Sequence, residues 1–431
     1  MQGFFTNRSV AERCHILKML KKQAQAEHYS YHTPGHKQKG YDITELGYSD
    51  NLSCPRGVIL SAQEDIAQML GADASYILTD GSTAGVLSML YALKTLGCRT
   101  VAAVTASHKS FFNGCLLTGL QPILLETPMG KNGLPRKICV GDLMEGIEGA
   151  DALFLTTPDY YGNVADLQAI QSECKKQGKY LVVDGAHGGH LHYNRAVHAG
   201  AYADMWVDGV HKSLPALTQG AVVSAKKACV DALQKAVDIF RTTSPSYPIM
   251  ASVEYAVKYP ENKELEGYIQ QQKRERAYLY ESEDYTKLCV FSVDGFALEA
   301  KAISEGIYPE FVSENLVCFY LSPVMDEMDI GRLFAFLGRA KSEGLLLDEK
   351  ELHSNPAPVE MVEIKENQTE KVPLSSAVGR ISATVCGLFP PCLPLIKKGE
   401  RITKEKIEAL QKASNIFGVD DGKILVYKDI T

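Results

Sequence analysis

Between residues 71 and 225 the sequence alternates short apolar runs with segments of helical periodicity, and this alternation limits the fold more than any other feature. The apolar runs are residues 101–104, 152–155, 180–183, 205–207 and 220–223. Runs that are apolar on both faces and joined by long connections are typical of buried parallel strands. Between them, Val86, Met89, Leu90 and Leu93 recur at helical spacing. The pattern predicts an α/β domain with an open sheet and a ligand site at the carboxyl ends of its strands.

The composition changes after about residue 260. Residues 261–284 are rich in Glu, Lys, Gln and Arg and predict a long exposed helix, whereas residues 316–321 predict a strand of a smaller α+β domain. Residues 347–371 are polar and contain two prolines, as a linker does. We therefore predict an N-terminal arm (1–45), a large domain (46–260), a linking helix (261–287), a small α+β domain (288–350), and a linker with a C-terminal lobe (351–431).

Charge and cysteine usage exclude several classes of protein. The 45 basic and 52 acidic side chains give a net charge of −7, which disfavours binding to nucleic acid or to an anionic membrane. The 11 cysteines include no Cys-x-x-Cys pair, so a disulfide framework or a thiolate zinc site is not expected. The N-terminus lacks a basic segment followed by an apolar run. We expect a cytoplasmic protein.

Residues 80–85 (Asp-Gly-Ser-Thr-Ala-Gly) stand directly before the predicted helix at Val86. Glycines permit close approach of the backbone, hydroxyl groups donate hydrogen bonds, and a helix N-terminus favours an anion. Gly81, Ser82 and Thr83 are therefore candidates for a phosphate-binding site. Simple capping of the helix by Ser or Thr explains the segment alone equally well.

Two charged residues follow predicted strands. Asp184 ends the run 180–183, where a carboxylate can keep the ring nitrogen of pyridoxal phosphate protonated, although it can also simply cap a turn. Lys212 follows the run 205–207 among apolar and hydroxyl residues, which favours a lowered pKa and imine formation over an ordinary surface lysine. About one strand–helix unit separates the two, so they can meet at one edge of the sheet.

His108 follows the run 101–104. Its imidazole could stack on a flat heterocycle or transfer a proton, although a single histidine is more often structural. With the phosphate-binding candidates, Asp184 and Lys212, it completes a set at the ends of successive strands. This set favours a pyridoxal-phosphate enzyme.

A metal site is the alternative from another class. Its candidate ligands are His187, His190 and His192, with Asp184 and His198 nearby. Glycines 188 and 189 interrupt any helix that could present these histidines. We therefore expect no metal.

Several segments form an ordered pattern along the chain. They are residues 32–37 (His-Thr-Pro-Gly-His-Lys), 42–46, 81–83, 108–110, 158–162 (Pro-Asp-Tyr-Tyr-Gly), 184–188 (Asp-Gly-Ala-His-Gly), 211–218 (His-Lys-Ser-Leu-Pro-Ala-Leu-Thr), 243–247, 379–381 and 389–394. In this combination the chain resembles the bacterial Orn/Lys/Arg decarboxylase family of fold-type-I pyridoxal-phosphate enzymes, in its short form without the N-terminal wing domain.

The resemblance implies an aspartate-aminotransferase-like large domain with a mostly parallel, seven-stranded sheet, and a smaller α+β C-terminal domain. It implies pyridoxal 5'-phosphate as the cofactor, Lys212 as the lysine that binds it, His108 stacked on its ring and Asp184 at its ring nitrogen. It also implies a homodimer in which residues 243–247 reach the neighbouring active site. The cofactor-binding residues implied by the matched segments are Gly81, Ser82, Thr83, His108, Asp184, Ala186, His187, His211, Lys212 and Ser244.

The chain departs from the family pattern at several positions, although Lys212, Asp184 and His108 are all present. Gly209 stands where a Ser is usual, so one phosphate-binding hydroxyl is absent. The other departures are Asp80 for Asn, Thr105-Ala106 for Arg-Asn, Asp159 for Thr, Gly185 for Glu and Cys392 for Gly.

The resemblance implies decarboxylation of arginine, lysine or ornithine to the corresponding amine. Asp159 and Asp208 are the acids that we expect to receive the distal cation of such a substrate. An aminotransferase or another lyase of the same fold is an alternative, with Arg380 available for a substrate carboxylate. A catalytically weak paralogue is a second alternative, and a metallohydrolase is a third.

Overall fold

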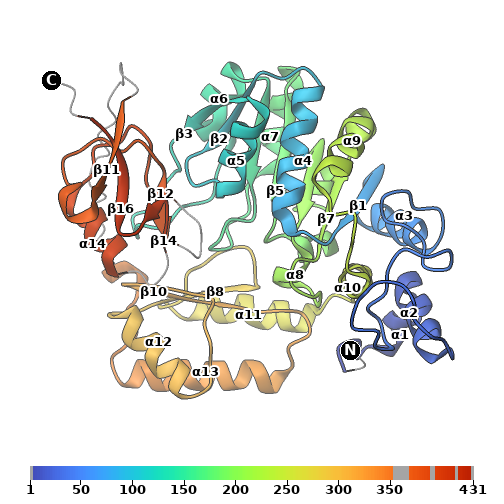
Figure 1. The fold of residues 1–431 in the computed structure, drawn as a ribbon. Coiled ribbons are helices and arrows are strands. Elements are labelled where there is room, and N and C mark those ends of the chain that lie inside the picture. Colours follow the sequence, from blue (N-terminus) through green and yellow to red (C-terminus); the bar gives the residue numbers. More distant parts are fainter. Residues whose placement is uncertain (1–2, 353–367, 389–393, 413–415, 429–431) are drawn as a thin grey trace. The chain divides into compact units, whose positions relative to one another are not determined.

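The computed structural model describes residues 3–352, 368–388, 394–412 and 416–428. Contacts divide these residues into two compact units (Figure 1). The first unit consists of residues 1–104, 110–128 and 135–351, and the second of residues 105–109, 129–134 and 352–431.

A seven-stranded sheet in the order β1-β7-β6-β5-β4-β2-β3 forms the centre of the first unit. Its strands are β1 (Ala74–Leu78), β2 (Thr100–Val104), β3 (Gln121–Leu125), β4 (Ala152–Thr156), β5 (Tyr180–Gly185), β6 (Met205–Asp208) and β7 (Ala221–Ala225). Strands β3, β2, β4, β5 and β6 pair in parallel, so the predicted α/β class with a mostly parallel sheet is confirmed. The parallel direction predicted for residues 220–223 is wrong, because β7 pairs antiparallel with both β6 and β1.

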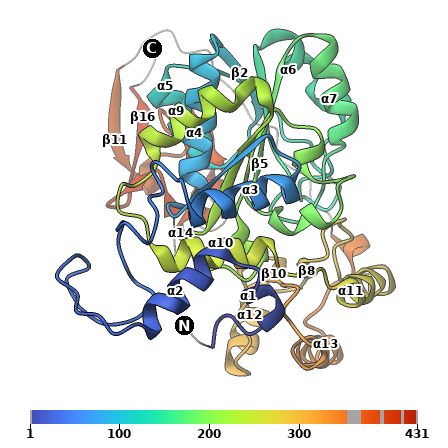
Figure 2. The same cartoon turned by 90° about the vertical axis from the view of Figure 1, so that its right-hand side faces the viewer.

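Side chains of the central strands alternate between two hydrophobic cores, as the two-residue period of a strand requires. Leu181 and Val183 of β5 enter one core and Val182 enters the other. The first core is covered by α2 (His15–Gln25), α3 (Val58–Leu70), α6 (Met144–Gly149), α7 (Leu167–Lys176) and α10 (Tyr247–Val257). The second is covered by α4 (Gly81–Thr95), α5 (Lys109–Thr118) and α9 (Val230–Phe240), with α4 and α9 side by side (Figure 2). Both faces of the sheet are thus buried, which explains its uninterrupted apolar strands.

The first unit also contains a smaller α+β layer. Its antiparallel sheet has the order β8-β10-β9, with β8 (Lys287–Phe291), β9 (Phe311–Ser313) and β10 (Leu316–Tyr320). Helices α11 (Lys263–Glu275), α12 (Gly295–Ser304) and α13 (Glu327–Ser342) accompany it. The helix predicted over 261–284 is therefore shorter, and it is not fully exposed, because Leu265 and Ile269 pack into the core of this layer.

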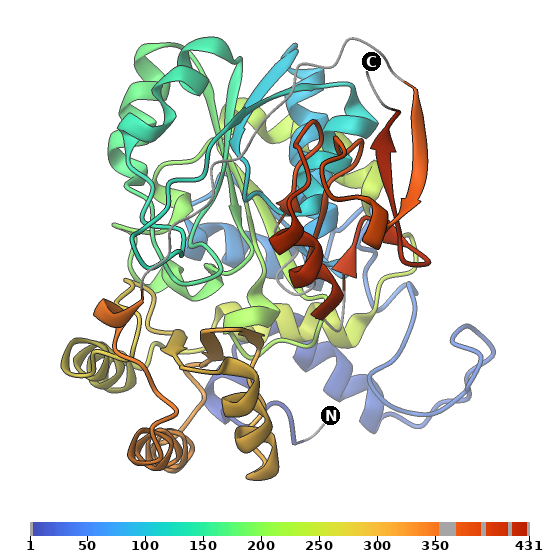
Figure 3. The same cartoon turned by 90° about the vertical axis from the view of Figure 1, so that its left-hand side faces the viewer.

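The described part of the second unit contains two small antiparallel sheets, a short 3-10 helix (Leu374–Ser376) and one α-helix (Figure 3). One sheet is formed by β11 (Thr369–Pro373), β15 (Val419–Asp420) and β16 (Lys423–Tyr427), and the other by β12 (Cys386–Leu388), β13 (Pro394–Ile396) and β14 (Ile416–Phe417). Helix α14 (Lys404–Lys412) contributes Ile407 and Leu410 to their core. Most of the linker predicted over 347–371 and the segment around Cys392 lie outside the described residues.

The N-terminal arm begins with α1 (Arg8–Ala11) and α2. The carboxylate of Glu254 in α10 accepts hydrogen bonds from the first two backbone N–H groups of α2, at His15 and Ile16. A buried carboxylate at this position offsets the positive end of the helix dipole and fixes α2 against α10. Among the described residues, no helix is both long and apolar enough to cross a membrane.

Candidate active site

The carboxyl ends of β1, β5 and β6 lie at the same edge of the sheet, because β1 and β6 both run antiparallel to β7 and β5 runs parallel to β6. The chain leaves this edge through the N-terminus of α4, through the loop after Asp184, and through the short helix α8 (Val210–Ser213), which contains Lys212. Three of the four predicted features thus follow strands that end at one edge, which is where open α/β sheets bind their ligands.

Asp184 lies at the end of β5 and is 2% exposed. Its Oδ1 accepts a hydrogen bond from the backbone N–H of Ala186 at 3.1 Å. Burial raises the pKa of the carboxyl group above its usual value, although the positive charge of Lys212 and the N–H of Ala186 oppose this shift. The ionised carboxylate is therefore short of positive charge in the protein alone.

Lys212 is half-buried, and its Nζ lies 3.1 Å from Nε2 of His187. The ring of His187 makes edge contacts with two tyrosines, Tyr160 and Tyr320, at centroid distances of 5.2 and 5.8 Å. These aromatic neighbours hold the imidazole in place. The sequence motif 184–188 thus brings a histidine directly to the amine that follows the next strand.

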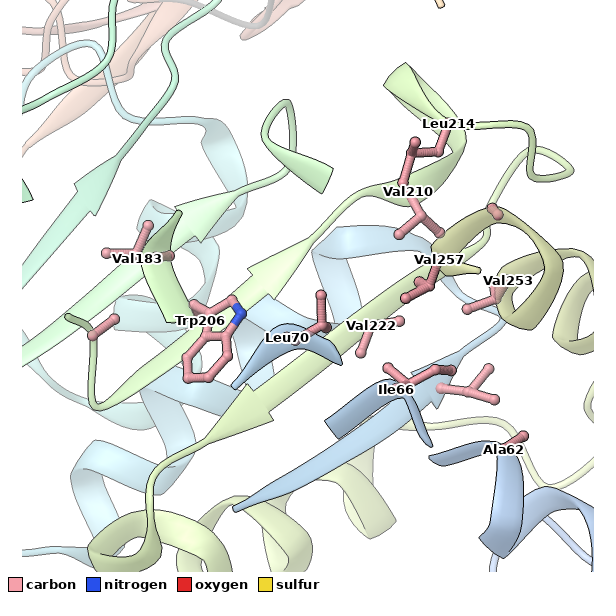
Figure 4. Packing of buried hydrophobic residues seen from close by; sticks show 14 of the residues in the cluster. Ala62, Ile66, Leu70, Val183, Trp206, Val210, Leu214, Val222, Val253 and Val257 are labelled. Carbon is pink, nitrogen blue, oxygen red and sulfur yellow. The ribbon is translucent and has the colours of Figure 1, made fainter. Parts of the chain in front are cut away.

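Helix α8 is anchored by apolar side chains on both sides of Lys212. Val210 and Leu214 are buried in the same cluster as Val253 and Val257 of α10 (Figure 4). A four-residue helix has little stability of its own, so this packing determines its position. The apolar residues that the sequence places around the lysine therefore serve to fix it at the sheet edge.

Ser82 lies in the first turn of α4, and its Oγ is buried without a hydrogen-bond partner among the described residues. Gly209 faces it closely: a Cβ at this position would lie 2.7 Å from Ser82 Oγ and 2.3 Å from the carbonyl oxygen of Ala186. The serine that the family pattern places at 209 would therefore clash here. A buried hydroxyl with no protein partner at a helix N-terminus fits a bound phosphate, which is the part of the cofactor that needs such donors.

The remaining predicted cofactor residues lie in varied settings. Nδ1 of His211 is 2.9 Å from the carbonyl oxygen of Gly220, whereas Thr83 and Ser244 are exposed in the single chain. Asp80 accepts a hydrogen bond from the backbone N–H of Thr242 at 3.3 Å. His108 stands just before α5 and belongs to the second unit, so its place at the cofactor ring stays a prediction.

The two acids expected to bind a substrate cation have other partners. Asp159 accepts hydrogen bonds from the backbone N–H groups of Tyr161 and Asn163 and from the Asn163 amide, at 2.7–2.9 Å. Burial raises its pKa to about 6, against these hydrogen bonds. Asp208 is buried, with Nε2 of His198 at 3.3 Å and Nε1 of Trp206 at 3.0 Å. Both carboxylates therefore already have hydrogen-bond partners within the protein.

The histidines of the alternative metal site point to separate partners. Nε2 of His190 lies 2.9 Å from Oδ1 of Asp284, and Nδ1 of His192 lies 2.7 Å from the carbonyl oxygen of Gly189. The described residues contain one group of three close metal-ligand atoms, His15, Asp65 and Glu254, and it includes none of these histidines. That group already holds the ammonium of Lys258, which contacts both of its carboxylates.

The sequence does not predict three residues that are linked to His187 directly or through Tyr160. Tyr160 lies in the motif 158–162, which had been matched without a role for its side chain. Tyr320 ends β10 and donates a hydrogen bond to the backbone carbonyl of Tyr160 at 2.9 Å. Glu310, just before β9, accepts a hydrogen bond from the Tyr160 hydroxyl at 3.2 Å. An aromatic residue at the end of a predicted strand was a usable signal for Tyr320, but no local pattern marks Glu310.

Arg380, the residue available for a substrate carboxylate in an aminotransferase, lies in the second unit. Its Nη2 is 2.7 Å from Oε1 of Glu370 and donates to the carbonyl oxygen of Tyr427 at 2.9 Å. These contacts join β11 to β16 and give the guanidinium a structural role within its own unit.

Comparison with known proteins gives consistent results over most of the chain. The family model "Orn/Lys/Arg decarboxylase, major domain" matches residues 40–292, and "Orn/Lys/Arg decarboxylase, C-terminal domain" matches residues 346–416. The chain is 28% identical to the uncharacterized protein YaaO of Bacillus subtilis (92% of this chain and 93% of YaaO). It is 26% identical to an arginine decarboxylase of the same organism (91% and 92%). The structure of the constitutive lysine decarboxylase of Escherichia coli is similar in fold, with a TM-score of 0.71, 19% identity and coverage of 97% and 82%.

Proposed function

The chain belongs to the Orn/Lys/Arg decarboxylase family, and we propose that it binds pyridoxal 5'-phosphate and decarboxylates a basic amino acid. The substrate class is arginine, lysine or ornithine, and the products are CO2 and the corresponding amine. The observation that carries the proposal is the pairing of Asp184, a buried carboxylate short of positive charge, with Lys212 at the edge of the sheet. A cofactor with a protonatable ring nitrogen and a reactive aldehyde suits both groups.

The residues present fit the cofactor at its three polar points. The Ser82 hydroxyl and the N-terminus of α4 would bind its phosphate, and Asp184 would keep its ring nitrogen protonated. Lys212 would hold it covalently, and His108 would cover its ring. A side chain at position 209 would lie against Ser82 Oγ. We therefore propose that the Ser82 hydroxyl contacts the phosphate without the second hydroxyl that a serine at 209 would add.

When bound, the cofactor supplies an electron sink for the negative charge that loss of CO2 leaves on the substrate Cα. Lys212, or His187 through its contact with Lys212, would then return a proton to Cα. The tyrosines around His187 would restrict access of water to this proton transfer. We further propose a cytoplasmic homodimer with shared active sites, in which the exposed Ser244 completes the neighbouring site.

Covalent attachment of the cofactor tests the proposal. Protein loaded with pyridoxal phosphate is reduced with borohydride, digested, and analysed by mass spectrometry for a modified Lys212. In Lys212→Ala we expect no modified peptide and a loss of CO2 release by about 10³-fold or more. Lys235→Ala, an exposed lysine on α9, is the matched control and should behave as the unmodified protein. Normal attachment and CO2 release in Lys212→Ala would refute the assignment.

The product distinguishes the alternatives. Loaded protein is incubated with arginine, lysine, ornithine and a set of neutral and acidic amino acids, and both CO2 and keto acids are measured. Amine and CO2 from one basic amino acid support the decarboxylase. Keto acid would indicate an aminotransferase, and cofactor binding without turnover of any amino acid would indicate a weak paralogue.

A further inference from the structure

Selection of a basic substrate requires a carboxylate that can face its distal cation. The acids first considered, Asp159 and Asp208, are bound to the protein's own backbone amides, imidazole and indole. Asp284 is also occupied, by His190 and Thr286. These three buried acids therefore leave the cation of a substrate without a counter-charge.

Glu310 differs from these acids in both exposure and partners. Its side chain is exposed, and across the described part of the chain it makes no ion pair. By contrast, the nearby Glu305 contacts Arg339 and Lys301. The polar contact of the Glu310 carboxylate is the hydroxyl of Tyr160 at 3.2 Å. Glu310 therefore has a neutral donor and no cationic partner among the described residues.

Tyr160 connects this carboxylate to Lys212. Its ring lies 5.2 Å from the ring of His187, whose Nε2 lies 3.1 Å from Lys212 Nζ, and its hydroxyl reaches Glu310. The phenol is fixed at its other end, because Tyr320 donates to its backbone carbonyl. Tyr160 thus contacts both the histidine beside Lys212 and the Glu310 carboxylate.

Further aromatic side chains surround Tyr160. Tyr160 makes ring contacts with Phe311 and Tyr320 at centroid distances of 5.8 and 5.5 Å. Aromatic faces accept the methylene groups and the cationic end of a basic side chain, and they favour a cation over a neutral group. The charge of Glu310 and the aromatic rings around Tyr160 would therefore both favour a cationic side chain.

We propose that Glu310 is the specificity-determining residue of the site, and that it receives the distal ammonium or guanidinium group of the substrate beside Tyr160. The inference rests on the proposed function, because it takes the α-amino group of the substrate to replace the Lys212 amine on the cofactor that Lys212 would hold. Because its contact is the hydroxyl of Tyr160, we expect Glu310 to act on substrate choice and not on cofactor binding.

Titration with matched amino acids tests the inference. The cofactor-loaded protein is titrated with lysine and with its neutral analogue norleucine, and with arginine and its neutral analogue citrulline, while cofactor absorbance is followed. We expect the unmodified protein to bind the cationic member of one pair at least about tenfold more tightly, as for a hydrogen bond between charged groups. In Glu310→Gln this preference should fall to near one, and KM for the basic substrate should rise about tenfold or more with a smaller change in kcat.

Glu314→Gln is the matched control, since Glu314 is an exposed glutamate in the turn between β9 and β10. It should retain the full preference. Tyr160→Phe removes the hydroxyl that holds Glu310 and should reduce the preference by a smaller factor. Both glutamates are exposed, so circular dichroism should show folded protein for each variant.

The outcomes separate this inference from the proposed function. If the protein releases CO2 from a basic amino acid and Glu310→Gln keeps the cation preference, the role of Glu310 is refuted and the decarboxylase stands. If no amino acid is decarboxylated but the binding preference is lost in Glu310→Gln, the role of Glu310 stands and the decarboxylase is refuted. A protein that binds cationic and neutral analogues equally refutes the role of Glu310 directly.

Discussion

Asp184 and Asp284 are two aspartates with the same degree of burial and opposite electrostatic settings. Their exposed fractions are 2% and 1%. Burial raises the pKa of Asp184 despite the charge of Lys212. Burial alone would also raise the pKa of Asp284, but the charges of His190 and Lys287, with hydrogen bonds from His190 and Thr286, hold it well below its usual value. The protein itself compensates the charge of one carboxylate and leaves the other incompletely compensated.

This difference separates a structural cluster from a binding site. Around Asp284, Lys287 Nζ contacts Thr286 Oγ1 at 2.9 Å and stacks on the Tyr320 ring at 4.3 Å. Buried polar atoms without a hydrogen-bond partner among the described residues occur in both places: Ser82 Oγ at the Asp184 edge, and Asp284 Oδ2 and His190 Nδ1 in the Asp284 cluster. The two places differ in charge, because cationic neighbours lower the pKa of Asp284 whereas burial raises that of Asp184. This difference in charge compensation supports a cofactor at Asp184 and a structural role for Asp284.

Asp284→Asn should have the largest effect on folding. The substitution leaves His190 and Lys287 buried without their counter-charge, for which a loss of about 3–5 kcal/mol in the free energy of unfolding is expected. Urea unfolding followed by circular dichroism measures it. Asp231→Asn, an exposed aspartate on α9, is the control and should change stability by less than about 0.5 kcal/mol. A loss below about 1 kcal/mol in Asp284→Asn would contradict the structural role of Asp284.

Asp184→Asn should reduce activity strongly without reducing stability. Without its charge the ring nitrogen of the cofactor loses its partner, and we expect CO2 release to fall about 10²–10³-fold. The stability of the cofactor-free protein should stay equal or rise by about 1–2 kcal/mol, because a poorly compensated buried charge is removed. Activity assays and urea unfolding of the cofactor-free variant measure the two effects. A large loss of stability would give Asp184 a structural role as well.

The pH dependence of the cofactor-free protein should differ accordingly. The folded protein holds the Asp184 proton more tightly than the unfolded chain, whose pKa is near the ordinary 3.8. The contribution of this group to stability is therefore constant below that value and falls as the pH rises from it toward the folded pKa. Asp184→Asn should remove this fall, which unfolding midpoints measured between pH 4 and pH 8 would show. An unchanged pH profile would contradict the assigned direction.

Thr286→Val should have a smaller effect of the same kind as Asp284→Asn. The hydroxyl of Thr286 donates to Asp284 Oδ1 at 2.7 Å and accepts from Lys287 Nζ at 2.9 Å. Replacing it by a methyl group should reduce stability by about 2 kcal/mol, as for hydrogen bonds to charged groups. Urea unfolding should give the same loss with and without the cofactor. A loss confined to the loaded protein would connect this cluster with the cofactor.

Some features of the site can be predicted from the sequence and others cannot. Residues that follow a buried strand directly, such as Asp184 and Lys212, could be placed because strand ends are visible as apolar runs and parallel strands end at one edge. The antiparallel direction of β7 could not be predicted, because an apolar run has the same sequence pattern in a parallel and in an antiparallel strand. Strands β1 and β3 were missed, and the exposed residues of β3 at Gln121 and Pro122 weaken its pattern.

Partners from distant parts of the chain were the second limit. Asp159 and Asp208 are expected from the sequence to receive a substrate cation, because the hydrogen-bond donors that occupy them are set by tertiary structure. Glu310 lies 150 residues after Tyr160, and no spacing predicts that they meet. The opposite settings of Asp184 and Asp284 likewise depend on neighbours such as His190, which the sequence offered as a metal ligand.

Ser82→Ala gives the smallest predicted effect and the most direct test of incomplete compensation. Among the described residues its hydroxyl has no hydrogen-bond partner, so removal should not reduce the stability of the cofactor-free protein. The affinity for pyridoxal phosphate should fall about tenfold through one lost hydrogen bond to a phosphate. Ser88→Ala on the same helix is the inverse control, because its hydroxyl donates to the Ala84 carbonyl at 2.8 Å. It should change stability by about 1 kcal/mol or less and leave cofactor affinity unchanged. Fluorescence titration measures the cofactor affinity of each variant, and thermal unfolding measures its stability. Equal effects of both variants on cofactor affinity would mean that the Ser82 hydroxyl does not face the phosphate.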